Sequence, residues 1–221
     1  MSFALAPGQR AERKKLITVS EWKSSTGDFY VLQTSKPKDW DTEYDTYYTQ
    51  ASTTTPTYEP VTGDTAPTWA TNTYYTRVDR EILGTRTPDS SIEYNADIET
   101  STDILGNNYT DVNNTQPQQD FDPYLILGGS KLGAFLNDIR SRNAVSELNQ
   151  FTLYVITAFD VVISGSDTSY KTEKHEDCTI AYNSIGGDAN VNFPISVYFS
   201  NKLTNGTVDK LADDFVFTAN S

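Results

Sequence analysis

The residues whose types could most readily support catalysis or metal binding are His175, Glu176, Asp177 and Cys178. Here the only histidine and the only cysteine of the chain lie beside two carboxylates. The surrounding segment, 170–182, alternates in the manner of a β-strand. Because successive side chains of a strand point to opposite faces, Lys171, Glu173, His175 and Asp177 share one charged face, which we predict to be wet, and Cys178 takes the other. This excludes a local Cys-His dyad, and we find no further ligands for a metal site. We expect neither catalysis nor metal binding here.

Paired carboxylates suggest a second chemistry. Glu93 with Asp97, or Glu99 with Asp103, could serve as the acid and base of a glycosidase, but such pairs arise by chance in an acidic block. A loose calcium-loop pattern is formed by Asp103, Asn107, Asp111 and Asn113. It lacks the bidentate glutamate of an EF-hand. The chain also lacks a glycine-rich phosphate loop, a Gly-x-Ser-x-Gly elbow and a His-Glu-x-x-His helix, so we expect no enzyme activity and no cofactor.

Charge is distributed unevenly along the chain. Sixteen of the thirty acidic residues lie between Asp39 and Asp122 with only three basic residues, so this block carries the whole net charge of −13. Residues 10–38 instead hold seven basic residues against three acidic ones, including Arg13, Lys14 and Lys15. An acidic surface repels nucleic acid, and segments of opposite charge favour head-to-tail association.

Composition and length indicate a folded protein of one or two domains. The 221 residues include 14 Tyr, 10 Phe and 3 Trp, which is too aromatic for a disordered chain. The single cysteine excludes an internal disulfide, and no apolar run suits a signal peptide or a membrane span. We expect synthesis in the cytoplasm, no membrane insertion of this chain, and three parts: an arm and first hairpin (1–36), a small β insertion (37–78) and the remaining core (79–221).

An aromatic motif occurs twice in residues 37–78, each time as a Trp followed by Tyr-Tyr-Thr. Its members are Trp40, Tyr47, Tyr48, Trp69, Tyr74 and Tyr75. A Trp that covers a neighbouring Tyr pair predicts a small β module. If the six rings are exposed they form a patch that could stack on sugar rings, so a carbohydrate-binding surface module is an alternative.

Residue patterns elsewhere predict strands. Alternation predicts strands at 151–163, 170–182 and 191–199, and two short apolar runs at 16–22 and 29–33 predict a first hairpin. Turn signals at residues 165–167, 186–188 and 205–206 separate the later strands.

One helix is predicted. Ser130 is a suitable N-cap, and the residues after it place Leu132, Phe135, Leu136 and Ile139 on one apolar face. A short amphipathic helix of this kind covers one side of a sheet. The elements together predict a mainly β fold, an antiparallel sandwich or part-barrel with one flanking α-helix and a small β insertion.

Short motifs in a fixed order cover residues 80–219. The first are Ser90-Ser91-Ile92-Glu93, Asp97, Glu99-Thr100 and Thr102-Asp103-Ile104-Leu105-Gly106-Asn107. They are followed by Phe121-Asp122-Pro123 before the helix, then Gly186-Gly187, Gly206-Thr207-Val208 and Phe215-Val216-Phe217-Thr218-Ala219. In order and spacing these motifs resemble the major tail tube proteins of tailed bacteriophages. The aromatic double repeat looks foreign to that family and resembles small insertions of phage structural proteins.

The resemblance implies a structural virion protein of the phage tail, with a tail-tube-like fold, that self-assembles into hexameric rings stacked as a tube for DNA ejection. Its partners would be further copies of itself and other tail proteins: a sheath if the tail is contractile, a tape measure and terminators. DNA would pass through without specific binding, because an acidic lumen gains nothing from counterion release.

Candidate residues follow for each surface of such a tube. We predict that Glu173 and Asp177 face the lumen. The predicted inter-subunit or inter-ring residues are Glu93, Asp97, Glu99, Asp103 and Asp111, with Arg13, Lys14 and Lys15. A head-decoration or head-completion protein is the near alternative, and it predicts a closed oligomer instead of filaments of indefinite length.

Overall fold

The computed structural model is mainly β and antiparallel, with one α-helix among the residues it describes. These are residues 16–33, 36, 47–52, 56–61, 73–84, 87, 90–126, 129–164, 167–187 and 191–220. The first strands are β1 (Leu16–Lys23), β2 (Phe29–Leu32), β3 (Tyr47–Ser52), β4 (Thr57–Pro60), β5 (Tyr75–Ile82), β6 (Ile92–Glu93), β7 (Asp97–Thr102), β8 (Asn108–Asn114) and β9 (Gln118–Phe121). Next come α2 (Lys131–Arg142), a 3-10 turn η2 (Val145–Asn149), β10 (Phe151–Ser164), β11 (Asp167–Tyr182), β12 (Ile195–Tyr198), β13 (Lys202–Val208) and β14 (Phe217–Ala219). The predicted fold class is therefore confirmed as mainly β, with sheets consistent with a β-sandwich.

The chain divides into two compact units, and the divisions fall within β1 and β5. The large unit comprises Met1–Ser20 and Glu81–Ser221, and the small unit comprises Glu21–Arg80. The sequence places the insertion at 37–78, whereas the small unit also takes in the end of β1 and all of β2.

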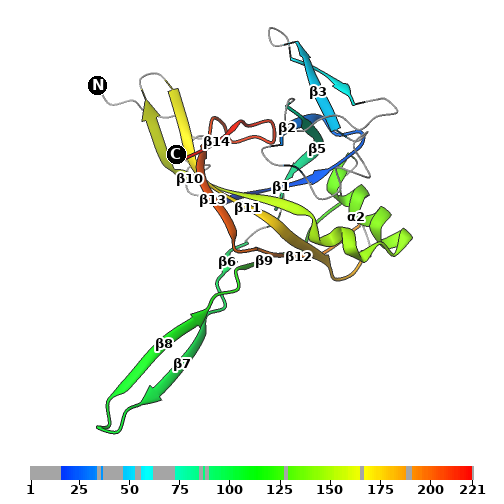
Figure 1. Ribbon diagram of the computed structural model, residues 1–221. Coiled ribbons are helices and arrows are strands. Elements are labelled where there is room, and N and C mark those ends of the chain that lie inside the picture. Colours follow the sequence, from blue (N-terminus) through cyan, green and yellow to red (C-terminus); the bar gives the residue numbers. More distant parts are fainter. Residues whose placement is uncertain are drawn as a thin grey trace, which may run out of the picture. The chain divides into compact units, whose positions relative to one another are not determined.

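The large unit is organised around the long antiparallel pair β10–β11. Its strand order is β1-β10-β11-β12-β9-β6, with β13 paired to β11 and β14 paired to β13 (Figure 1). The pairing runs from Phe151 opposite Cys178 to Ser164 opposite Asp167, which confirms the strands predicted at 151–163 and 170–182. On one part of β10 the residues Tyr154 and Ile156 pack in a buried cluster with Val19, Val208 and Phe215.

Helix α2 begins where the sequence predicts it. The Ser130 hydroxyl accepts a hydrogen bond from the Gly133 amide at 3.0 Å, and Leu132, Leu136 and Ile139 are buried. The Glu81 carboxylate adds a second anchor, since it accepts hydrogen bonds from Ser130 Oγ at 2.9 Å and from the Leu132 amide at 3.0 Å. A carboxylate at a helix N-terminus is favoured by the helix dipole. The helix is thus fixed to the end of β5.

The Glu81 carboxylate also accepts a hydrogen bond from the Tyr124 hydroxyl at 2.7 Å. Burial, and then the adjacent negative charge, raise the pKa of Tyr124 well above its usual value. The hydroxyl therefore remains a donor throughout the neutral range.

The small unit contains β2, β3, β4 and the first part of β5. β2 pairs with β5, so the predicted hairpin between 16–22 and 29–33 is replaced by a pairing of Phe29 with Val78 and its neighbours. β3 pairs with both β4 and β5, and places Tyr48 directly opposite Tyr75. The two copies of the aromatic repeat thus contribute neighbouring antiparallel strands.

Two further sequence predictions are corrected. The strand predicted at 191–199 is shorter, because Pro194 has no amide hydrogen to donate and the ladder of β12 begins at Ile195. The turn predicted at Asn205-Gly206 does not form, because both residues lie inside β13. Gly206 is there for a steric reason: a Cβ atom would lie 2.3 Å from the carbonyl oxygen of Thr218 and 2.6 Å from the Phe217 ring.

We therefore expect Gly206→Ala to lower the free energy of unfolding by about 1–3 kcal/mol, as overpacking does. The Thr218 oxygen belongs to the backbone of β14, so the strand itself must move. Chemical denaturation with far-UV circular dichroism measures the loss. Asn205→Ala, one residue away on the same strand, is the control, and equal stability of the two variants would contradict the prediction.

Candidate functional site

The hairpin β7–β8 is the most unusual surface of the large unit. Every residue of both strands is exposed. The two strands form a sheet of their own, which Figure 1 shows in green as a ribbon separate from the larger sheet. Isolated two-stranded ribbons are marginally stable in water. An element of this kind is expected to acquire a partner.

The two faces of the hairpin differ in chemistry. Residues paired across the strands share a face, and one face is made of Ile98 with Val112, Thr100 with Thr110, and Thr102 with Asn108. We call this the uncharged face. The other, which we call the acidic face, places Glu99 directly opposite Asp111, and Ser101 opposite Tyr109. Two carboxylates in such a position repel each other, so the acidic face gains by staying in water.

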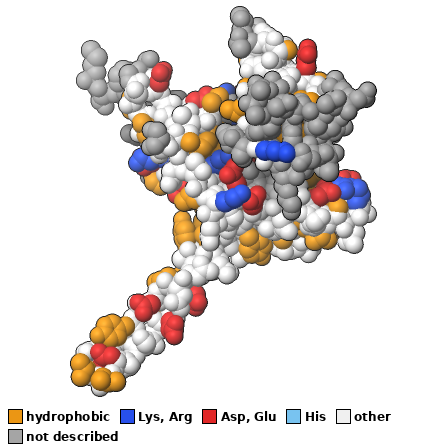
Figure 2. Space-filling model, in the orientation of Figure 1, with side chains coloured by type: hydrophobic (Ala, Val, Ile, Leu, Met, Phe, Trp, Pro, Cys, Tyr) orange, Lys and Arg blue, Asp and Glu red, His pale blue; other side chains and the backbone are white. Residues whose placement is uncertain are grey.

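The hairpin ends in a tightly bonded turn. The Asp103 carboxylate accepts hydrogen bonds from the Leu105 amide at 2.8 Å, from the Asn107 amide and side chain at 2.9 Å each, and from the Tyr109 hydroxyl at 3.1 Å. The turn presents Ile104 and Leu105 with relative exposures of 102% and 80%. Figure 2 shows hydrophobic side chains gathered at this end of the hairpin and acidic ones along it. The tip is an ordered apolar projection.

Hydrogen bonds from Asn107, Leu105 and Tyr109 hold the pKa of Asp103 below its usual value. A lowered pKa stabilises the turn above the unfolded value near 3.8, and that stabilisation is lost as the pH falls through the folded value. We expect the amide resonances of Leu105 and Asn107 to titrate together below pH 3.8 in NMR spectra. Asp103→Asn should abolish this titration. Titration of both amides at or above pH 3.8 would contradict the bonding of the turn.

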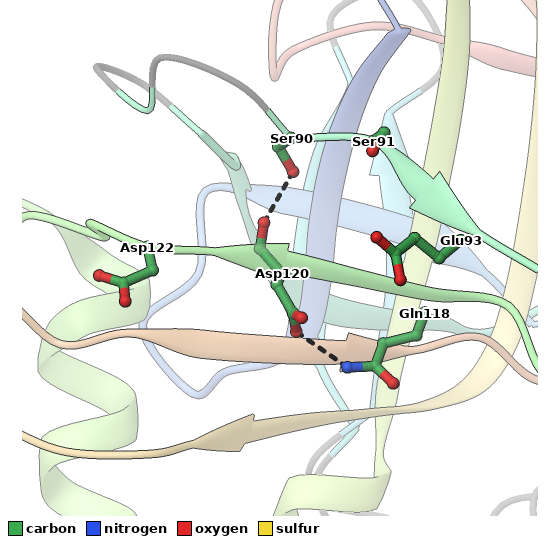
Figure 3. A pocket seen from close by; sticks show the side chains of 6 residues that line it. All are labelled: Ser90, Ser91, Glu93, Gln118, Asp120 and Asp122. Carbon is green, nitrogen blue, oxygen red and sulfur yellow. Dashed lines mark hydrogen bonds between the residues drawn. The ribbon is translucent and has the colours of Figure 1, made fainter. Parts of the chain in front are cut away.

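The five predicted acidic contact residues lie on or beside this hairpin. Asp97, Glu99 and Asp111 are exposed on the strands, and Asp103 forms the turn. Glu93 lies on β6, at a hollow also lined by Ser90, Ser91, Gln118, Asp120 and Asp122 (Figure 3). The prediction that these residues form contacts between subunits stays a prediction.

The hollow beside β6 is small, and several of the residues that line it are hydrogen-bonded to one another. Ser90 Oγ donates to the Asp120 carbonyl oxygen at 2.9 Å, and Gln118 Nε2 donates to Asp120 Oδ1 at 3.0 Å (Figure 3). Its volume of about 230 Å³ is below the roughly 300–1,000 Å³ of small-molecule sites. In the described part of the chain, no group of three or more His, Cys, Asp or Glu side chains could hold a metal ion. The calcium-loop residues Asn107 and Asn113 instead bond to Asp103 and Glu99.

The charged face predicted for 170–182 is interrupted. Glu173 is exposed and lies 3.5 Å from His175 Nε2, but His175 is buried and its ring lies edge-on to Phe199. Two residues later the strand bulges: Asp177 has a φ of 56°, and its carboxylate contacts Lys202 Nζ at 2.7 Å. The expectation of one continuous wet face is therefore wrong for His175. The prediction that Cys178 lies on the other face is also wrong, because the bulge brings Cys178 and His175 opposite Phe151 and Leu153, which share one face of β10. Glu173 and Asp177 are both exposed, and their position in a lumen stays a prediction.

The predicted aromatic patch is wrong for two of its members. Tyr47 and Tyr74 are buried in the small unit with Val61, at 2% and 1% exposure. Tyr48 and Tyr75 are half-buried and join a cluster with Tyr30 and Tyr58, in which Tyr30 and Tyr58 stack at 4.1 Å. These rings contact one another. The remaining members, Trp40 and Trp69, lie outside the described residues, as do the predicted basic contacts Arg13, Lys14 and Lys15.

Comparison with known proteins gives no family. Neither the protein-family models nor the curated proteins compared with the chain match it. Within the described ranges, no helix is long and apolar enough to cross a membrane. Function therefore has to be inferred from the surfaces of the chain itself.

Proposed function

We propose that this chain is a structural virion protein that self-assembles into stacked hexameric rings and forms the tail tube of a bacteriophage, the conduit for DNA ejection. It acts through its surfaces and not through a catalytic group. Its partners are further copies of itself and the other proteins of the tail.

The observation that carries this proposal is the β7–β8 hairpin. Both of its strands are exposed along their whole length, and its tip presents Ile104 and Leu105 to solvent. Exposed apolar surface on a projecting hairpin is typical of a protein interface. The resemblance to tail tube proteins begins in the same region, at Ser90 to Asn107. An assembly subunit accounts for both features.

The net negative charge of the chain is consistent with a conduit whose wall does not bind DNA. A net charge of −13 makes contact with phosphates unfavourable, because the gain from counterion release requires basic groups. The basic segment 10–38 and the acidic block that follows it favour head-to-tail contacts between copies.

Size-exclusion chromatography with light scattering, followed by negative-stain electron microscopy, tests the proposal on the purified full chain. We expect species that grow with concentration and appear as rings or tubes with an open channel. A closed oligomer that does not stack would favour the head-decoration or head-completion alternative. A chain that remains monomeric at every concentration and salt condition would overturn the proposal.

The carbohydrate-binding alternative loses support from the small unit. Two of its proposed rings are buried, and two are occupied by contacts with Tyr30 and Tyr58. Binding to a glycan array that is lost in Trp40→Ala and Trp69→Ala would restore it.

A further inference from the structure

The β7–β8 hairpin carries an unusual combination of an exposed uncharged face and an exposed acidic face. Segments 97–102 and 108–114 together hold three acidic residues and no basic residue, and the turn adds Asp103. Glu99 and Asp111, which lie opposite each other on the acidic face, are absent from the uncharged face, where Ile98, Val112 and threonines lie in register. In a folded domain such a face is normally covered and the acidic one is wet.

The chemistry of the two faces restricts the kind of partner. Carboxylates along the ribbon disfavour nucleic acid and anionic lipid surfaces. Rows of β-branched side chains instead match another pleated protein surface, where Thr, Val and Ile of two sheets interdigitate. A protein with an exposed, uncharged β-surface is therefore the expected partner.

The chain itself offers a matching surface at the far end of the β10–β11 pair. There Val161 pairs with Tyr170, and Ile163 pairs with Thr168, which places four uncharged residues on one face. Val161 and Tyr170 are half-buried, and Tyr170 packs against the core cluster, so the exposed part of this face is its end, where Ile163 is 72% exposed and Thr168 is exposed as well. This surface uses different residues from the hairpin. Two different exposed surfaces of like chemistry on one chain suit a heterologous contact between copies, which propagates instead of closing as a dimer.

We propose that the β7–β8 hairpin binds a second copy of this chain, with its uncharged face and its Ile104–Leu105 tip on the Ile163 face of the neighbour, while Glu99 and Asp111 remain in water. This inference rests on the proposed function and specifies which face makes the contact. It reverses the sequence prediction for those two acids, which become solvent-facing and not contact residues.

A pair of neighbouring substitutions tests the face assignment. Thr100 and Ser101 are adjacent and exposed, and they point to opposite faces of the ribbon. Thr100→Asp puts a charge on the uncharged face, whereas Ser101→Asp adds the same charge to the acidic face. Because a buried unpaired charge is costly, we expect Thr100→Asp to raise the concentration needed for assembly by about tenfold or more, and Ser101→Asp to leave it near that of the wild type. Light scattering across a concentration series measures both.

A mixing experiment tests the identity of the partner surface. Ile163→Asp should impair assembly as Thr100→Asp does. Each variant retains the surface that the other lacks, so an equimolar mixture should form larger species than either variant alone. A mixture no larger than its components would overturn the pairing of these two surfaces.

The remaining outcomes separate this inference from the function on which it rests. If the wild type assembles and Thr100→Asp assembles equally well, the face assignment is wrong and the proposed function stands. If the wild type never assembles, the proposed function fails and this inference fails with it. Circular dichroism of each variant monitors folding, and a Thr100→Val variant, which keeps the face uncharged, should assemble even if Thr100→Asp unfolds.

Discussion

Replacing Glu21 by leucine is expected to lower the free energy of unfolding of the small unit by about 3–5 kcal/mol. Glu21 Oε2 lies 2.6 Å from Arg80 Nε, and both side chains are buried, with relative exposures of 7% and 8%. The Arg80 guanidinium also lies over the Phe29 ring, 5.2 Å from its centroid. Removing the carboxylate takes this ion pair from a buried cation, and breaking a buried pair on one side is among the most destabilising changes a point mutation can make.

The control is the double variant Glu21→Leu with Arg80→Met. Taking away both charges removes the cost of burying them, so the double variant should recover most of the lost stability. Urea denaturation followed by tryptophan fluorescence suits this unit, since all three tryptophans of the chain, Trp22, Trp40 and Trp69, fall within Glu21–Arg80. A double variant that is less stable than Glu21→Leu alone would show that Arg80 contributes mainly through its other contacts.

Ile156→Ala is expected to lower the free energy of unfolding of the large unit by about 2–5 kcal/mol. Ile156 is completely buried on β10, in the cluster with Val19, Tyr154, Val208 and Phe215. Truncation removes three side-chain carbons and leaves a cavity that the paired strands on either side cannot readily fill. The effect should appear as a lower midpoint in chemical denaturation.

Ile156→Val calibrates this expectation, because it removes a single carbon and should cost about 0.5–1.5 kcal/mol. Val162→Ala, on the exposed end of the same strand, should change the free energy of unfolding by about 0.5 kcal/mol or less. Similar losses from Ile156→Ala and Val162→Ala would contradict the placement of the core.

The parts of the fold that were predictable carry strong local signals. Helix α2 has a serine cap and a regular apolar stripe. Strands β10 and β11 have long runs in which side chains alternate. These patterns depend on residues close in sequence, so they can be recognised without knowing which distant parts of the chain the element contacts.

The parts that were not predictable depend on distant neighbours. Asn205-Gly206 has the composition of a turn, but Gly206 is required because β14 passes too close for a side chain. Likewise, the alternation around His175 fails because Glu176 and Asp177 form a bulge opposite β10, where the partner of Phe151 is Cys178 and that of Leu153 is His175. Neither the close approach of a distant strand nor a β-bulge can be recognised reliably from the local sequence.

The candidate site was predictable in location but not in chemistry. The acidic residues of 93–111 mark a segment that the structure forms into an exposed hairpin, and its role in contacts stays a prediction. The signal that was missed is the alternation of Ile98, Thr100 and Thr102 with Glu99 and Ser101, which marks one face as uncharged. In the small unit the repeat indicated a small β module, but it did not show that the first tyrosine of each pair is buried.

The most direct test of the account is a cryo-electron microscopy reconstruction of the assembled particle at a resolution that separates strands. We expect an open tube of stacked rings in which the uncharged face of β7–β8 is covered by a neighbouring copy and Glu99 and Asp111 face solvent. A particle without a channel, or a tube in which that face remains exposed to solvent, would contradict it.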